Sequence, residues 1–259
     1  MSGSSIILHG DAADLRSLFS EHGIDSPVQC VVTSPPYNTG QPYVGVADDM
    51  PLGRHLDLIG DWAREIAAVV DHGGRVWVNV PPALPIGGDT QRDGRWSPMT
   101  TWWKALLAAG LRYRDTVVWY TNDADQATAW GSWMSPSAPN LRGRWEAVLL
   151  FFKGTWNRGL SHDLESDGVS PREFTEWTQN VWAIPPARRS GHPCPFPDEL
   201  ARRAILLSTV PGETVLDPFA GSGTTIRVAH QLGRHGIGVD LSAAYVDQYI
   251  ERGVQEVLA

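Results

Sequence analysis

One short stretch, Val215–Thr225, constrains the fold more than any other part of the chain. It reads V-L-D-P-F-A-G-S-G-T-T, an apolar strand that runs into Asp217, then a turn with two glycines and the start of a helix. Glycines in such a turn let the backbone approach a ligand more closely than side chains would. The following strand, Gly236–Val239, leads into Asp240, where nucleoside-binding α/β folds place an acceptor for ribose hydroxyls. Together these features predict a nucleoside site.

The remaining sequence alternates apolar strands with helical periodicity, which predicts a doubly wound α/β fold with a seven-stranded, mainly parallel sheet. Its 259 residues fit a single domain. Apolar residues recur at helical spacing from Leu58 to Val70 and from Val246 to Val257, and we interpret both stripes as core-facing. The seven predicted strands are Ser5–His9, Gln29–Thr33, Arg75–Val80, Asp115–Tyr120, Ala147–Phe152, Thr214–Leu216 and Gly236–Val239.

Composition narrows the possible partners and compartments. The 21 Lys and Arg residues against 29 Asp and Glu give a net charge of −8, which argues against a protein that coats nucleic acid nonspecifically. A DNA enzyme of this composition must concentrate its basic residues on one face. The sequence shows neither a signal peptide nor an apolar run of membrane-spanning length, so we expect a soluble, cytoplasmic protein. Cys30 and Cys194 have neither disulfide-framework nor zinc-site spacing, and no metal is expected.

A second motif, T-S-P-P-Y-N at Thr33–Asn38, follows an apolar strand. It is therefore expected at the carboxyl edge of the sheet, where open α/β folds bind their ligands. Its two prolines fix φ and remove two backbone donors. The hydroxyl of Ser34 and the carbonyl of Pro35 are then acceptors for an amine, with the ring of Tyr37 as a flat surface. The alternative is that the motif is only a rigid turn whose tyrosine fills space in the core. The nearby nucleoside motif disfavours this alternative.

These motifs resemble those of the S-adenosyl-L-methionine-dependent DNA amino-methyltransferases, in the circularly permuted group whose catalytic motif precedes the cofactor motif. The resemblance covers nearly the whole chain. It includes the block H-P-C-P-F-P at His192–Pro197, and further blocks match in the same order: Asp11 in I-I-L-H-G-D-A, G-G-R-V-W-V-N-V, and R-W-E-A-V-L-L-F-F-K. The resemblance implies a class I, Rossmann-like methyltransferase fold. It also implies that the target base is flipped out of double-stranded DNA.

The resemblance assigns roles to individual residues. Residues 1–153 would form a catalytic half, 154–190 a short target-recognition insertion, and 191–259 a cofactor-binding half. Arg142, Arg144, Arg188 and Arg189 are candidates for DNA phosphate contacts, with a solvated surface as the alternative. The catalytic residues would be Ser34, Pro35, Pro36 and Tyr37. The cofactor-binding residues would be Asp11, Thr33, His192, Phe196, Asp217, Phe219, Gly221, Ser222, Gly223, Thr224 and Asp240.

The target base follows from Ser34. Family members that methylate adenine N6 usually carry Asp at this position and those that methylate cytosine N4 usually carry Ser, so we expect a cytosine-N4 enzyme, with adenine N6 as the alternative. A catalytically inactive DNA-binding module is a further alternative, although both glycines, both acids and the catalytic tetrad are present. Association with the nucleoid and a cognate restriction endonuclease would fit the resemblance. The recognition sequence, and whether the protein is a monomer or a homodimer, stay open.

Overall fold

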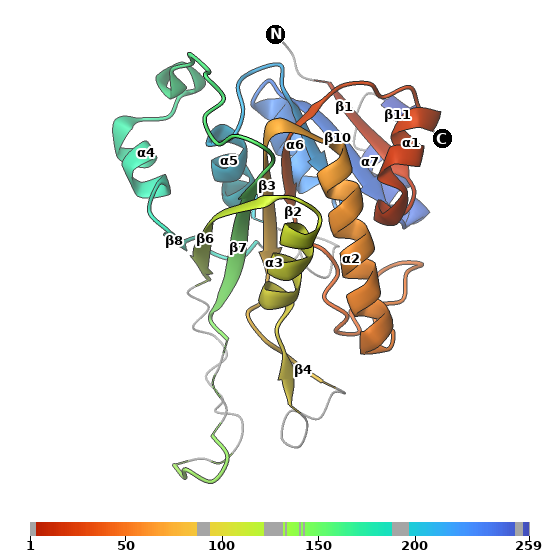
Figure 1. Ribbon diagram of the computed structural model, residues 1–259, viewed down its shortest axis with the longest axis vertical. Coiled ribbons are helices and arrows are strands. Elements are labelled where there is room, and N and C mark those ends of the chain that lie inside the picture. Colours follow the sequence, from red (N-terminus) through yellow and green to blue (C-terminus); the bar gives the residue numbers. More distant parts are fainter. Residues whose placement is uncertain are drawn as a thin grey trace.

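The computed structural model describes residues 4–86, 94–121, 132, 134–139, 141, 143–187, 197–251 and 256–258. Its centre is a nine-stranded sheet with the order β11-β1-β10-β9-β2-β3-β7-β6-β8 (Figure 1). The strands of this sheet are β1 (Ser5–His9), β2 (Val28–Thr33), β3 (Val70–Val80), β6 (Arg112–Tyr120), β7 (Trp145–Phe152), β8 (Val181–Ala183), β9 (Thr214–Asp217), β10 (His235–Asp240) and β11 (Glu256–Leu258).

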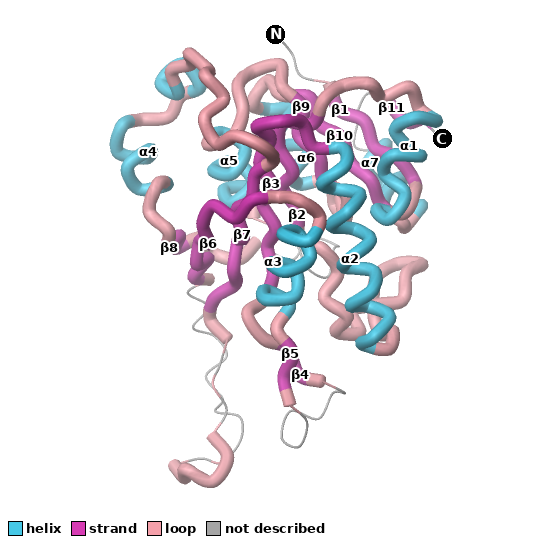
Figure 2. Tube along the Cα trace, viewed as in Figure 1, coloured by secondary structure: helices cyan, strands magenta, loops and turns pink. Residues whose placement is uncertain are grey.

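Helices connect these strands, and a small hairpin extends from the sheet (Figure 2). The hairpin is formed by β4 (Leu84–Pro85) and β5 (Arg95–Trp96), which pair antiparallel. The helices are α1 (Leu15–Glu21), α2 (Leu52–Val69), α3 (Pro98–Ala108), α4 (Pro171–Trp177), α5 (Asp198–Leu206), α6 (Thr224–Gln231) and α7 (Ala243–Glu251), with the 3-10 turns η1 (Ala12–Asp14) and η2 (Leu164–Asp167).

Every strand of the main sheet runs parallel to its neighbours except β7, which is antiparallel to both β3 and β6. The carboxyl ends of the parallel strands therefore meet the amino end of β7 at one edge, which we call the carboxyl edge; the opposite one is the amino edge. At the centre, β9 and β2 are neighbours whose following helices lead in opposite directions along the sheet. Such a switch point is where open α/β folds bind ligands.

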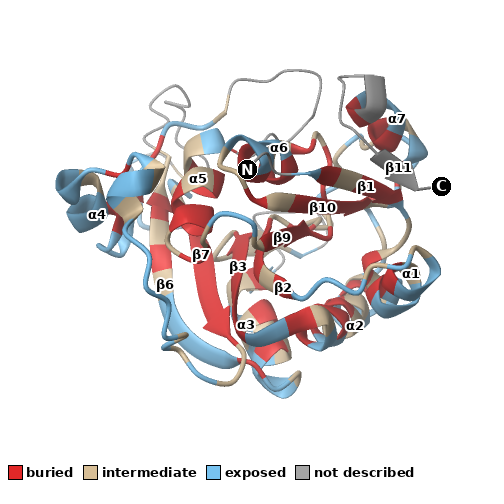
Figure 3. Cartoon of the chain, turned by 90° about the horizontal axis from the view of Figure 1, so that it is seen from above, coloured by how far each residue is buried: buried red, intermediate tan, exposed pale blue. Residues whose placement is uncertain are grey.

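Helices cover both faces of the sheet (Figure 3). One core joins α1, α2 and α3 to one face, and a second joins α5 and α6 to the other, while Val246 and Tyr249 of α7 pack beside Ile7 of β1. Successive residues of β2 point to opposite faces, so Val31 lies in the first core and Val32 in the second. A strand buried on both sides reads as a continuous apolar run, which explains the V-Q-C-V-V sequence.

All seven predicted strands are present, with ends that differ by a few residues, and the expected doubly wound, mainly parallel sheet is confirmed. The predicted strand number was too low, because β8 and β11 extend the sheet at its two sides. The helical stripe predicted to continue to Val257 was also wrong. Helix α7 ends at Glu251, and Val257 pairs with Ile7 of β1. Pairing covers backbone groups that would otherwise be exposed along the edge of β1.

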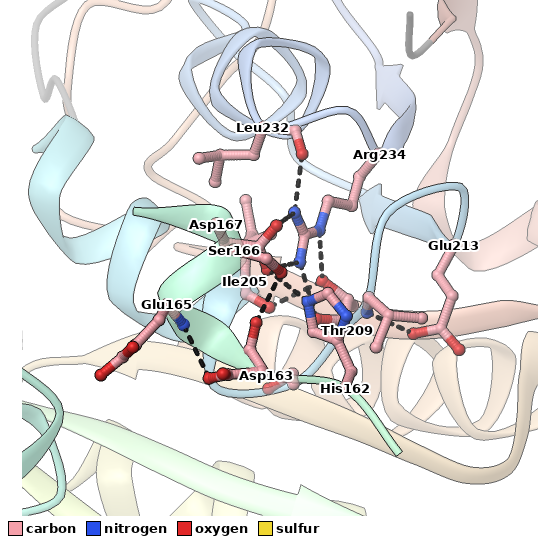
Figure 4. Close-up of polar contacts among 12 residues, drawn as sticks. His162, Asp163, Glu165, Ser166, Asp167, Ile205, Thr209, Glu213, Leu232 and Arg234 are labelled. Carbon is pink, nitrogen blue, oxygen red and sulfur yellow. Dashed lines mark hydrogen bonds and ion pairs between the residues drawn. The ribbon is translucent and has the colours of Figure 1, made fainter. Parts of the chain in front are cut away.

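The described part of the predicted recognition insertion, 154–190, includes contacts with the amino edge of the sheet. Arg234, which directly precedes β10, donates to the carboxylate of Asp167 at 3.2 and 2.9 Å and to Thr209 just before β9 (Figure 4). Arg158 forms an ion pair with Glu213, which also precedes β9. These contacts attach η2 and its flanks to the amino edge, away from the carboxyl ends of the strands. Within the described part of the insertion, therefore, residues up to the start of β8 buttress the fold.

Candidate active site

The T-S-P-P-Y motif continues from β2 at the carboxyl edge, and its polar groups form a compact network. Ser34 Oγ lies 2.8 Å from Tyr37 Oη. Tyr37 Oη lies 3.0 Å from Glu146 Oε2, at the start of β7. Asn79 Nδ2, near the end of β3, donates to Tyr37 Oη at 3.0 Å and to Glu146 Oε2 at 2.6 Å. Three strands thus bring four polar side chains together, because the amino end of antiparallel β7 lies beside the carboxyl ends of β2 and β3.

Burial sets the protonation of this network. Removal from water raises the pKa of the Glu146 carboxyl, against the hydrogen bonds from Asn79 and Tyr37, which act in the opposite direction. Burial, together with the nearby Glu146 charge, raises the pKa of Tyr37 well above its ordinary value. Tyr37 is therefore a neutral phenol whose hydroxyl is held from several sides, which fixes the orientation of its ring.

Sequence reasoning missed Asn79 and Glu146 as site residues. Both stand in blocks that are otherwise apolar, V-W-V-N-V and W-E-A-V-L-L. A charged or amide side chain within a buried strand needs a partner, and that requirement was the available signal. The sequence did not show that the two residues share Tyr37 as their partner.

A cavity of about 340 Å³ opens beside this network, a volume within the roughly 300–1,000 Å³ usual for small-molecule sites. The predicted catalytic and cofactor residues largely meet here. Thr33 and Gly223 are absent from its wall. The lining includes Asp11, Ser34, Pro35, Pro36, Tyr37, Asp48, His55, Trp62, Asp217, Phe219, Gly221, Ser222, Thr224, Asp240 and Tyr245.

The floor of the cavity is the turn after β9. Asp217 Oδ1 accepts from Thr33 Oγ1 at 2.7 Å and from the Phe219 amide at 3.2 Å. Burial raises the pKa of Asp217 to about 6, although these hydrogen bonds favour its ionised form. Thr33 therefore lies behind the wall and holds Asp217. The neighbouring acid, Asp240, accepts from the Gly221 amide at 2.7 Å.

Gly223 has a different role from the close ligand approach that the sequence suggested. Its φ is +76°, in the left-handed region, and it caps the amino end of α6. A Cβ at this position would lie 2.0 Å from the ring of Tyr249 in α7. Glycine is required here by the turn and by helix packing.

The far end of the cavity is aromatic. Trp62 stacks on Trp102 and meets the edge of Phe219, with ring centroids 4.9 Å apart in the latter pair. His55, which sequence reasoning also missed, is only 1% exposed and lies between Trp62 and Trp96. Neither ring nitrogen of His55 has a partner among the described residues, and burial lowers its pKa. A neutral imidazole with free nitrogens thus borders this end of the cavity.

The segment between the T-S-P-P-Y motif and α2 covers the cavity, and we call residues 38–51 the covering loop. Asp48 is buried and accepts from the amides of Asn38, Thr39 and Gln41 at 2.8, 3.0 and 3.1 Å. The hydroxyl of Ser242, two residues beyond Asp240, donates to the Val44 carbonyl at 2.6 Å. The loop is thus fixed at its base by one carboxylate and at its tip by the segment after β10.

Of the predicted DNA contacts, Arg144 is described. It is exposed immediately before β7, and its guanidinium lies 5.8 Å from the centroid of the Tyr120 ring. Its position at the carboxyl edge places it beside the network of Ser34 and Tyr37. The predictions for Arg142, Arg188, Arg189, His192 and Phe196 concern positions outside the described residues.

The cavity fits an adenosyl sulfonium. Its aromatic end suits a flat purine, and Asp11, Asp48, Asp217 and Asp240 give the wall negative charge that suits a cation. Within the described ranges, no cluster of three or more His, Cys, Asp or Glu side chains could hold a metal ion. In that same part of the chain, no helix combines the length and apolarity needed to cross a bilayer.

A doubly wound sheet with a ligand-sized cavity at its switch point, beside the T-S-P-P-Y turn, is the arrangement of a Rossmann-like methyltransferase. The chain belongs to the DNA methylase family of N6/N4 methyltransferases, whose model matches residues 28–251. It is an S-adenosyl-L-methionine-dependent DNA methyltransferase.

Individual relatives agree with this placement. The type II methyltransferase M.MjaVI of Methanocaldococcus jannaschii is 32% identical over 61% of this chain and 77% of its own length. DNA adenine methyltransferase YhdJ of Escherichia coli K12 is 29% identical over 95% of this chain and 81% of its own. Among solved structures, the putative DNA modification methylase TTHA0409 of Thermus thermophilus, complexed with S-adenosyl-L-methionine, superposes with a TM-score of 0.74. It is 25% identical, and the match covers 99% of this chain and 100% of the other.

Proposed function

We propose that this protein methylates the N4 amine of cytosine in a specific sequence of double-stranded DNA, after the base is flipped out of the helix. The observation that carries the proposal is that Ser34 lines the same cavity as Asp217 and Phe219. An amine acceptor of this kind, a neutral hydroxyl next to a proline carbonyl, therefore lies within reach of the cofactor pocket.

S-adenosyl-L-methionine supplies, when bound, an electrophilic methyl carbon on a sulfonium. The amine of cytosine is a weak nucleophile, since its lone pair is delocalised into the ring. Ser34 Oγ and the Pro35 carbonyl accept its two hydrogens, which favours a pyramidal nitrogen as positive charge develops. The ring of Tyr37, fixed through its hydroxyl by Asn79 and Glu146, provides a wall that orients the base.

For the cofactor, we assign the ribose hydroxyls to Asp240 and the adenine amine to Asp11. Asp240 already accepts from the Gly221 and Ser242 amides, which orients its carboxylate at the cavity wall. Asp11 accepts from the Ala13 amide at 2.8 Å and lies beside Trp62. Both bonds to Asp11 fall on Oδ1, and a carboxylate offers about four acceptor positions, so each acid can also accept from a ligand.

We assign DNA contacts to the carboxyl edge. The β4–β5 hairpin extends there (Figure 2), with Arg95 exposed, and Arg144 is exposed immediately before β7. Base flipping requires that the protein bind phosphates next to the cavity into which the base turns. This supports Arg95 and Arg144 as phosphate contacts in preference to the amino-edge residues of the predicted insertion.

Adenine N6 is the second candidate, because YhdJ, which is named a DNA adenine methyltransferase, is similar over 95% of the chain. The deciding experiment incubates the protein with labelled S-adenosyl-L-methionine and genomic DNA, digests the product and weighs its nucleosides. We expect N4-methylcytosine. If N6-methyladenine is the only product, the target is the N6 amine of adenine and the cytosine assignment is wrong. A stable DNA complex without any methylated product would favour the inactive binding module.

A further inference from the structure

We propose that Ser34, Tyr37 and Glu146 form a proton path that removes the proton lost by the methylated amine and delivers it to Glu146 Oε2. The inference rests on the proposed function, since it requires an exocyclic amine as the methyl acceptor. It goes beyond that proposal by giving a role to Glu146, a half-buried carboxyl that does not line the cavity.

The chemistry balances without another reactant. The amine lone pair forms the new nitrogen–carbon bond while the carbon–sulfur bond breaks and its electron pair stays on sulfur. The nitrogen then carries a positive charge and one proton too many. That proton passes to Ser34 Oγ as the hydroxyl proton of Ser34 moves to Tyr37 Oη and the phenol proton moves to Glu146 Oε2. Ser34 and Tyr37 end as they began, and Glu146 becomes a neutral acid that loses its proton to water after product release.

The donors and acceptors around Tyr37 Oη determine the direction in which protons can move along this path. Tyr37 Oη has one hydrogen and can accept two, and it lies 2.8 Å from Ser34 Oγ and 3.0 Å from both Asn79 Nδ2 and Glu146 Oε2. The side-chain amide of Asn79 can only donate to Tyr37 Oη. The phenol hydrogen has two acceptors in reach, Glu146 Oε2 and the Asn79 backbone carbonyl at 3.1 Å, and an ionised carboxylate is the stronger of the two. The second accepted bond then comes from the Ser34 hydroxyl, whose oxygen is left to accept from the amine. The hydrogen bonds from the amine to Ser34, from Ser34 to Tyr37 and from Tyr37 to Glu146 therefore all donate in the direction away from the cavity.

The surroundings of Glu146 suit a proton acceptor. Its described contacts are neutral: Tyr37 from the turn after β2, Asn79 from β3, and Trp119 as its register partner on β6. Tyr43 of the covering loop also contributes to the raised pKa of Tyr37. Arg144 lies two residues before Glu146, immediately before β7. Burial raises the pKa of the carboxyl, which brings it closer to the working pH and makes it a stronger base than an exposed glutamate.

Glu146→Gln tests the path because it keeps the shape and the acceptor oxygen but not the basicity. Methyl transfer is measured in a single turnover at saturating cofactor, from about pH 5 to about pH 9. For the natural protein we expect the rate to fall on the acid side, where Glu146 becomes protonated. For Glu146→Gln we expect a rate about 10²-fold lower, with the acid limb absent. Glu165→Gln, an exposed change on η2 with the same loss of charge, is the matched control and should keep the natural profile.

Tyr37→Phe breaks the path at its middle and provides a second test should Glu146→Gln fold poorly. It should also lose the acid limb, and the double variant should be no slower than the slower single variant, since both interrupt one path. An acid limb retained in either folded variant, additive losses, or a fall in rate matched by a fall in cofactor affinity would overturn the proposal. If the natural protein yields no methylated DNA, the proposed function fails; if it is active and the variants keep its profile, only the proton path fails.

Discussion

At the scale of single residues, Asp217 is a buried acid whose charge changes just below neutral pH. Its pKa is raised to about 6 by burial, so it loses its charge as the pH falls through that value. An uncharged Asp217 attracts a sulfonium less, and we expect cofactor affinity to decrease below about pH 6 in the natural protein. Asp217→Asn should bind more weakly at neutral pH and show little of this pH dependence. Calorimetric titration at several pH values measures both, and a variant that follows the natural curve would contradict the assignment.

Ser34 is the residue on which the amine chemistry depends. Ser34→Ala removes an acceptor of the amine hydrogen, and we expect methyl transfer to slow by about 10²–10³-fold, the cost of losing one preorganised hydrogen-bonding group. Cofactor binding should change little, because the cofactor assignments fall on other residues. Single-turnover rates and calorimetry on the same preparation separate the two effects. A variant that loses affinity but keeps its rate would place Ser34 on the cofactor side of the site.

Sequence predicted the residues that lie within contiguous motifs and missed those whose role depends on strand pairing. Ser34, Asp217 and Asp240 stand in short blocks whose local conformation fixes their position. Glu146 is separated from Tyr37 by 109 residues, and the two meet only because β7 runs antiparallel beside β3. Strand direction is not encoded in the hydrophobic period, so no local pattern could place Glu146 in the site.

At the scale of elements, the covering loop is held mainly by Asp48. Its carboxylate accepts three backbone amides, and bonds to a charged group are worth roughly 1.5–3 kcal/mol each. Asp48→Asn removes the charge and replaces one acceptor by a donor. We expect cofactor affinity to fall about tenfold or more, through faster dissociation. The neighbouring Asp49→Asn, on an exposed residue, is the matched control. Stopped-flow release of the cofactor measures the difference, and equal rates for the two variants would exclude the loop from cofactor retention.

The predicted insertion contains Trp and Arg side chains whose roles depend on where the segment lies. Trp177 is 2% exposed, and Arg158 is paired with Glu213. Aromatic and basic side chains serve equally in a core-flanking buttress, where Trp fills space and Arg satisfies carbonyls and acids. Composition could not distinguish DNA contact from core packing, because the role of the segment depends on which edge of the sheet it packs against.

At the scale of the whole molecule, Arg234 ties the insertion to the cofactor half. It is completely buried and contacts Asp167, Thr209 and the Leu232 carbonyl. Arg234→Ala leaves Asp167 without its main partner, so we expect a loss of about 3–5 kcal/mol in the free energy of unfolding. Arg227→Ala, which removes an exposed ion pair with Asp198, should cost no more than about 1 kcal/mol. Urea denaturation measures the free energy of unfolding of both variants. Equal losses would show that the contacts of Arg234 do not stabilise the fold more than an exposed ion pair does.

Net charge governs how the protein binds DNA. With a net charge of −8, affinity must come from a few clustered cations, so log affinity should decrease less steeply with log salt than for a basic coat protein. Arg144→Ala should reduce this slope by about one unit. Arg172→Ala, an exposed change on α4, should leave it unaltered. Filter binding over a salt series provides the slopes, and a natural slope in Arg144→Ala would remove this residue from the phosphate contacts.

The strand order also determines when the protein can fold during its synthesis. β1 and β2 follow each other in the chain, but β10 and β9 lie between them in the sheet. Until those late strands leave the ribosome, β1 lacks a described neighbour and β2 is open on one side, so the nascent chain exposes two apolar edges. We expect chains halted before Thr214 to bind chaperones and to resist folding, and chains extended past Asp240 to become protease-resistant. Translation of the last strands, more than collapse of the first, would then limit the yield of folded enzyme.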